Sequence, residues 1–143
     1  MPDRDRPLLI VKIDRQLFAI ESAFIREVVS APPVFSLPFP LDDIQSLAVL
    51  RGEPHAILDG LYFLRLPHRE RDKVLFLIGH MGLFVDDAIQ TIRHDLPETD
   101  PETLKKDRSW FHPYTINFRG QEIPVLNVPK VLTHVPDKIR PFI

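Results

Sequence analysis

The sequence predicts an all-β domain made of two small barrels, and three observations support this class. The chain has 15 prolines and only 5 glycines. Because proline is costly inside long helices and central strands, many short elements are expected. Short apolar runs bounded by turn residues recur along the chain, as they do in β-proteins. Two of these patterns repeat at nearly the same offset, which predicts two similar halves.

The expected strands occur mostly in pairs around short turns. They are residues 8–13, 17–20, 25–29, 47–50 and 55–58. One further strand pair is expected within 73–92 and another within 116–128. Short helical turns are expected at Glu21–Phe24, Gly60–Leu66, Pro101–Lys106 and Val128–Leu132. The segment APPVFSLPFPLDDI, residues 31–44, contains four prolines and is expected to be an irregular loop.

The repeat defines the expected organisation of the domain. Leu83 and Phe84 follow Leu17 and Phe18 at an offset of 83 − 17 = 66 residues, and Arg119-Gly120 follows Arg51-Gly52 at 119 − 51 = 68. We therefore expect one domain over 1–143, with sub-barrels at about 8–66 and 74–132, a connector at 67–73 and a tail at 133–143. Each half supplies about five strands, which is too few for a large core of its own. The two halves should therefore pack around one shared hydrophobic core. The inward positions are predicted to be Leu17, Ile20, Val28, Ile57, Leu83, Val85, Ile92 and Val125.

Composition excludes several classes of protein. The formal net charge is −2, which argues against a nucleic-acid-binding surface. The chain has no cysteine, so disulfides and thiolate ligands are excluded. The N-terminal apolar run is too short for a signal peptide or a membrane span, so we expect a cytoplasmic protein without membrane insertion.

No pattern in the chain indicates catalysis. The six histidines lack metal-ligand spacing and are expected in loops or at the surface. The pairs Asp42-Asp43 and Asp86-Asp87 could bind a hard cation or act in acid-base chemistry, but such pairs more often cap turns. We therefore expect no enzymatic activity, no metal and no cofactor; a metal-dependent hydrolase built on these pairs is the weaker alternative.

A nucleic-acid-binding small barrel is the other alternative. Such barrels stack bases on aromatic side chains over basic grooves. Aromatic candidates are available at Phe18, Phe24, Phe35 and Phe39. The chain has 18 basic against 20 acidic residues, and the basic ones are not interleaved with these rings.

Several segments, taken in order, resemble CheW-like domains, the adaptors of bacterial chemosensory arrays. They include IREVV, PLDDIQSLAVLRGEPHAILDG, GLFVDDAIQTI and IPVLNVPKVL. The most specific pieces are Leu50-Arg51-Gly52 with Asp59 seven residues later, and Gly82–Asp86. The resemblance implies two five-stranded SH3-like or OB-like barrels around a shared core and no catalysis. It also implies binding to a chemoreceptor cytoplasmic tip and to the regulatory domain of a histidine kinase.

Carried over to this chain, the resemblance places the partner-binding site around one turn. The residues are Glu27, Val49, Leu50, Arg51 and Gly52. An arginine at such a turn should face water or a carboxylate, and Glu27 is the expected carboxylate. The alternative is that Arg51 is simply solvated.

The chain departs from the family pattern near this turn. Ser46 replaces a usual Gly, Val49 an Asn and Ala56 a Pro, and Gly60 replaces an apolar residue. These departures are expected in a divergent adaptor of a specialised system, such as surface motility or pili, or in one that has lost a partner.

Overall fold

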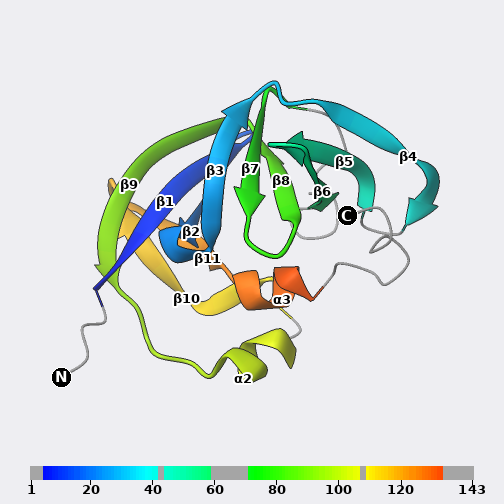
Figure 1. Ribbon diagram of the computed structural model, residues 1–143. Coiled ribbons are helices and arrows are strands. Elements are labelled where there is room, and N and C mark those ends of the chain that lie inside the picture. Colours follow the sequence, from blue (N-terminus) through cyan, green and yellow to red (C-terminus); the bar gives the residue numbers. More distant parts are fainter. Residues whose placement is uncertain (1–4, 42–43, 59–70, 107–108, 134–143) are drawn as a thin grey trace. The chain divides into compact units, whose positions relative to one another are not determined.

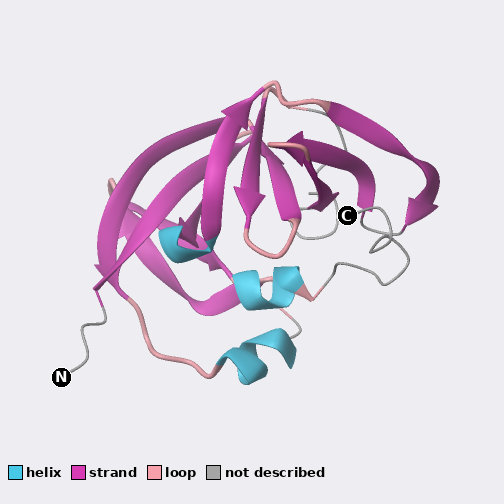
Figure 2. Cartoon of the chain, in the orientation of Figure 1, coloured by secondary structure: helices cyan, strands magenta, loops and turns pink. Residues whose placement is uncertain are grey.

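The computed structural model describes residues 5–41, 44–58, 71–106 and 109–133, and most of these residues lie in strands (Figure 2). The strands are β1 (Asp5–Ile13), β2 (Gln16–Glu21), β3 (Ile25–Ser30), β4 (Val34–Leu41), β5 (Ile44–Leu50), β6 (Glu53–Leu58), β7 (Lys73–Leu77), β8 (Met81–Val85), β9 (Asp87–Asp95), β10 (Phe111–Phe118) and β11 (Gln121–Leu126). The helical elements are the 3-10 turn η1 (Ser22–Phe24) and the helices α2 (Pro101–Lys106) and α3 (Val128–Leu132). These three short elements confirm the predicted helical turns, whereas the turn predicted at Gly60–Leu66 lies outside the described residues.

The described chain divides into two compact units. Residues 5–24 and 87–133 form a five-stranded unit with the sheet order β10-β11-β2-β1-β9. Residues 25–86 contain a six-stranded unit with the order β3-β7-β8-β6-β5-β4 (Figure 1). The expected division into 8–66 and 74–132 is corrected by this pairing, because the β1–β2 hairpin pairs with β9 and β11 instead of with the strands that follow it. Such long-range pairings have no local sequence signal.

The two sheets repeat one topology. The order β10-β11-β2-β1-β9 corresponds strand by strand to β5-β6-β8-β7-β3 in the other sheet. Each order contains one parallel contact between hairpins, β11 with β2 and β6 with β8. Arg51-Gly52 joins β5 to β6, and Arg119-Gly120 joins β10 to β11, so the prediction that these dipeptides occupy equivalent turns is confirmed.

The six-stranded sheet is strongly curled. Its edge strands β3 and β4 are consecutive in the chain and are joined by residues 31–33 alone. In a flat sheet the edges would be about 24 Å apart, whereas a connector of this length spans about 14 Å. The backbone N–H of Val49 in β5 also donates to the Pro33 carbonyl at 2.9 Å. The predicted all-β class is confirmed, although the pairings of the described strands leave both sheets open instead of closing them into barrels.

Strand β4 contradicts the predicted irregular loop. Val34–Leu41 runs antiparallel to β5 and lies at the edge of the sheet. Proline is tolerated in an edge strand because its missing N–H can fall on the unpaired side. The ladder is also irregular between Ser36 and Leu41, the stretch that holds Pro38 and Pro40. The predicted loop was wrong because the effect of a proline depends on whether its strand is central or at the edge of the sheet.

Most of the predicted core positions are buried. Ile20, Ile57, Leu83, Val85 and Val125 are fully enclosed. The others, Leu17, Val28 and Ile92, are half-buried. Val28 and Ile92 lie in the edge strands β3 and β9, where neighbours cover only part of a side chain. Among the described residues, no helix has the length and apolar character needed to cross a membrane.

Candidate protein-interaction site at an Arg-Gly turn

The turn between β5 and β6 has an unusual backbone that the sequence explains. Leu50 pairs with Glu53, and the two residues between them have positive φ, 50° at Arg51 and 79° at Gly52. Two positive φ values define the tight type I′ turn, whose twist matches that of the flanking strands. Glycine adopts this conformation at no steric cost, so Gly52 allows the turn to form. The Arg51 side chain is 69% exposed.

Arg51 is held by a carboxylate from a distant strand. Its guanidinium donates to Glu27 Oε1 on β3 at 2.7 Å, which confirms the predicted pair and removes the solvated alternative. The Glu27 side chain is itself 36% exposed. Exposed pairs of this kind contribute about 0–1 kcal/mol to stability. The pair therefore orients the arginine at the surface more than it stabilises the fold.

A second ion pair lies beside the first. The Arg26 guanidinium donates to Glu53 Oε2 and to His55 Nε2, both at 3.2 Å. His55 is fully buried, and its Nδ1–H donates to the Glu53 carbonyl at 2.9 Å, which leaves Nε2 as the acceptor for Arg26. Burial lowers the pKa of His55, and the neighbouring His80 and Arg26 lower it further. His55 is thus a neutral acceptor behind a charged rim.

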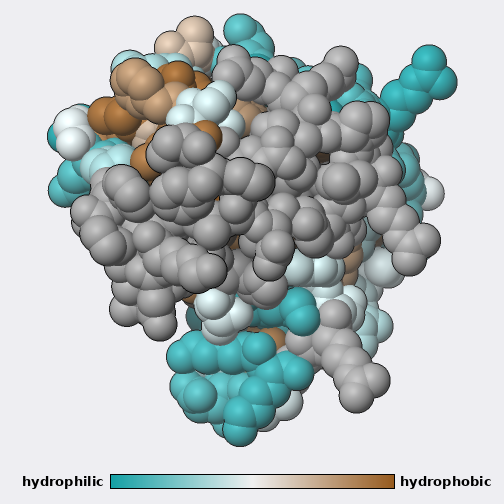
Figure 3. Space-filling model, turned by 90° about the vertical axis from the view of Figure 1, so that its right-hand side faces the viewer, coloured by the Kyte–Doolittle hydropathy of each residue, from teal (hydrophilic) through white to brown (hydrophobic). Residues whose placement is uncertain are grey.

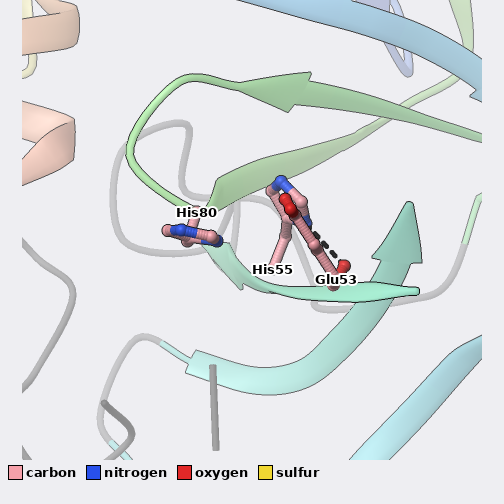
Figure 4. A group of neighbouring side chains, drawn as sticks. All are labelled: Glu53, His55 and His80. Atoms are coloured by element: carbon pink, nitrogen blue, oxygen red, sulfur yellow. Dashed lines mark hydrogen bonds between the residues drawn. The ribbon is translucent and has the colours of Figure 1, made fainter. Parts of the chain in front are cut away.

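Glu53, His55 and His80 form a cluster with metal-ligand chemistry (Figure 4). Their ligand atoms lie within 4.8 Å of one another. Arg26, however, contacts both Glu53 and His55, so a cationic group already occupies the position beside two of the three ligands. The His80 Nδ1 atom is buried and has no hydrogen-bond partner among the described residues. This arrangement favours a fixed polar network over a metal centre.

The histidine prediction is partly wrong, and sheet pairing explains why. His55 is fully buried and His112 is 8% exposed. His55 meets His80 because β6 and β8 run parallel, and the Ala56 N–H donates to the His80 carbonyl at 2.8 Å. A separation of 80 − 55 = 25 positions in the sequence hides this contact from any spacing rule. His68 and His134 lie outside the described residues.

The predicted partner-binding residues divide into an exposed and a buried group. Glu27, Arg51 and Gly52 lie at the surface of the turn. Leu50 is only 5% exposed and belongs to an apolar cluster under the turn, while Val49 is half-buried opposite Pro54. The cluster comprises Ala48, Leu50, Ile57, Val74, Phe76 and Phe84, with Val29 and Val34 packed against it.

Two departures from the family pattern are buried in the same sheet. Ser46 is 3% exposed and Ala56 is fully enclosed. The Ala56 N–H makes the bond to His80 described above, and a proline at this position would lack that donor. Gly60, with Asp59, lies outside the described residues.

Most of the described residues behind the alternative functions have structural roles. Asp86 accepts a hydrogen bond from Arg71 at 2.8 Å, and Asp87 accepts one from the Ala88 N–H, while Asp42 and Asp43 lie outside the described residues. Phe18 is buried in the core and so cannot stack a base. Phe24 is half-buried, and nothing is described of the Phe39 side chain. Phe35 on β4 is 59% exposed and remains as one surface ring.

The comparisons with known proteins agree with this architecture. The family model for the CheW-like domain matches residues 7–136. This chain belongs to the CheW-like domain family. Among solved structures it is similar to the scaffolding protein TtCheW from Thermoanaerobacter tengcongensis, with a TM-score of 0.65 and 17% sequence identity over 88% of this chain and 89% of that chain. No curated protein matches the sequence. At this identity the structural likeness supports the fold, and the family model supports the membership.

Proposed function

We propose that this CheW-like protein is a non-catalytic, cytoplasmic adaptor of chemosensory signalling. It binds the cytoplasmic tip of a chemoreceptor and the regulatory domain of a histidine kinase and so couples the two. Family membership supports the adaptor role. The observation that carries the site assignment is the exposed Arg51–Glu27 pair, which presents an oriented guanidinium on a tight turn.

The residues of the turn have different tasks in this proposal. Arg51, Glu27 and Gly52 contact a partner directly, because they are exposed. Leu50 and Val49 position the turn from below, since Leu50 packs in the apolar cluster. Reversible interfaces combine apolar contacts with a polar rim, and rim charges mainly steer association and select partners. A preoriented arginine suits this task because little side-chain entropy is lost when a partner binds.

The test is capture of cognate receptor-tip and kinase-regulatory fragments by the Arg51→Glu variant. The substitution places two carboxylates side by side and should weaken capture of at least one partner about tenfold or more. Arg119→Glu at the equivalent turn of the other unit is the matched control and should leave capture unchanged. A thermal melt should show both variants folded, because each arginine lies in an exposed turn.

Unchanged capture of both partners by folded Arg51→Glu protein would remove this turn from the interface. Equal losses in both variants would show that net charge, and not this turn, controls binding.

A further inference from the structure

The five-stranded unit contains a groove that the Arg-Gly turn does not explain. A hollow of about 430 Å³ lies among the ends of β1 and β2, the segment that leads into α2, and β10. A second hollow, of about 370 Å³, shares Phe24, Pro101 and Pro129 with it and extends to Leu132 and Lys105. Each volume lies in the range of about 300–1,000 Å³ typical of ligand sites.

The wall of this groove is held in place before any ligand binds. Helices α2 and α3 pack together (Figure 1). The buried Asn127 donates through Nδ2 to the Leu104 carbonyl at 2.9 Å, and its Oδ1 accepts the Lys130 N–H at 3.3 Å to cap α3. Polar side chains gather at the lower end of Figure 3, at the level where Figure 1 draws α2.

Glu21 is the unusual group in the first hollow. It is half-buried at the end of β2, and no described residue forms a hydrogen bond or ion pair with its carboxylate. Burial raises its pKa, and the charge of Arg6 only partly offsets this shift. Arg6 is thus a nearby charge and not a hydrogen-bond partner, and a carboxylate that loses water without gaining a hydrogen bond is costly to the fold. A cationic ligand would supply the missing partner.

The surroundings of Glu21 also favour a cation. Three carboxylates, those of Glu21, Glu98 and Asp100, line the hollow against the one guanidinium of Arg6. Aromatic rings line it as well: Phe24, and Tyr114 stacked on His112 with ring centroids 4.9 Å apart. The faces of phenyl and phenol rings attract cations.

We propose that this groove binds a partner polypeptide through a basic side chain whose cationic group pairs with Glu21. An apolar side chain of the same polypeptide lies against Pro101, Pro129 and Leu132 in the second hollow. A free amine would fill the first hollow alone, whereas a peptide with a basic and an apolar residue fills both. The groove belongs to the five-stranded unit and the Arg51 turn to the six-stranded unit. A test of the groove is therefore independent of the proposed adaptor site at the turn.

The test is an NMR titration of the full-length, ¹⁵N-labelled protein with three probes. These are the blocked tetrapeptide Arg-Ala-Ala-Leu amide, the same peptide with neutral citrulline in place of arginine, and N-acetylarginine amide. The arginine tetrapeptide should bind tightest and shift the backbone amides of Glu21, Thr99 and Leu104. Glu21→Gln should weaken its binding at least about tenfold, as expected for loss of a hydrogen bond to a charged group. Arg6→Gln should strengthen it, because a like charge is removed.

The Glu21→Gln protein should fold at least as well as wild type, since the substitution removes a half-buried charge. Equal binding of the citrulline peptide would overturn the cation assignment, and N-acetylarginine amide binding as tightly as the tetrapeptide would overturn the peptide assignment. Absence of binding at millimolar peptide, shifts confined to other residues, or an unchanged affinity in Glu21→Gln would overturn the site itself.

Discussion

The turns at Arg51 and Arg119 have the same backbone and different chemistry. Their φ values agree closely, 50° and 52° at the arginines and 79° and 80° at Gly52 and Gly120. Each arginine also reaches a strand at the opposite edge of its own repeat. Arg51 donates to the Glu27 carboxylate on β3, while Arg119 donates to the neutral Gln90 amide on β9 at 2.8 Å and lies over the Phe118 ring.

The residues behind the two turns differ in the same way. At the offset of 123 − 55 = 68 residues, the buried Ile123 takes the place of the buried His55. The repeated backbone is therefore independent of these polar groups, since one copy forms without them. The ion pairs and the buried imidazole are local additions to the six-stranded unit. Single substitutions can therefore give one repeat the residue that the other repeat has at the same position.

The largest effect is expected from the turn glycines. Gly52→Ala and Gly120→Ala should each lower the free energy of unfolding by about 1–2 kcal/mol, the cost of a side chain at positive φ. A Cβ atom would meet nothing within 4 Å at either position, so packing should not contribute. Urea unfolding of both variants measures the two costs. A clear loss at one glycine only would break the equivalence of the turns.

A smaller effect is expected from His55 as the pH falls. Because its folded-state pKa is lowered, the unfolded chain binds a proton at higher pH than the folded chain. Stability should therefore decline as the pH drops below about 6.5, until the folded-state pKa is passed. His55→Ile copies the other repeat and should flatten this decline in thermal melts across the range. An unchanged slope would assign the acid sensitivity to other groups.

The smallest effect is the salt dependence of the Arg51 pair. Glu27→Gln copies the Gln90 arrangement and should cost less than about 1 kcal/mol at low ionic strength and almost nothing in high salt. The reciprocal Gln90→Glu should introduce a salt-dependent gain at the Arg119 turn. Unfolding free energies measured at two salt concentrations compare the variants. If the free energy of unfolding depends on salt equally in wild type and in both variants, neither the Arg51–Glu27 pair nor the pair introduced by Gln90→Glu is formed in solution.

The sequence predicted local features well. Gly52 and Gly120 marked their turns, because glycine permits a positive φ. The helical turns predicted at Pro101–Lys106 and Val128–Leu132 have the bounds of α2 and α3. The Glu27–Arg51 contact was predicted only through the family resemblance. Pro38 and Pro40 led to the prediction of an irregular loop where the structure has β4. The effect of a proline depends on whether its strand is central or at an edge.

By itself, the sequence determined the all-β class, the repeat and the two Arg-Gly turns, since these follow from short-range patterns of apolar, proline and glycine residues. Tertiary structure alone decided that β1 and β2 pair with β9 and β11, that His55 meets His80 and Arg26, and that Glu21 faces a groove beside α2 and α3. Strand pairing and burial depend on contacts between distant parts of the chain, and many pairings are compatible with one alternating pattern. The local signals therefore specify the strands, and packing specifies which of them are neighbours.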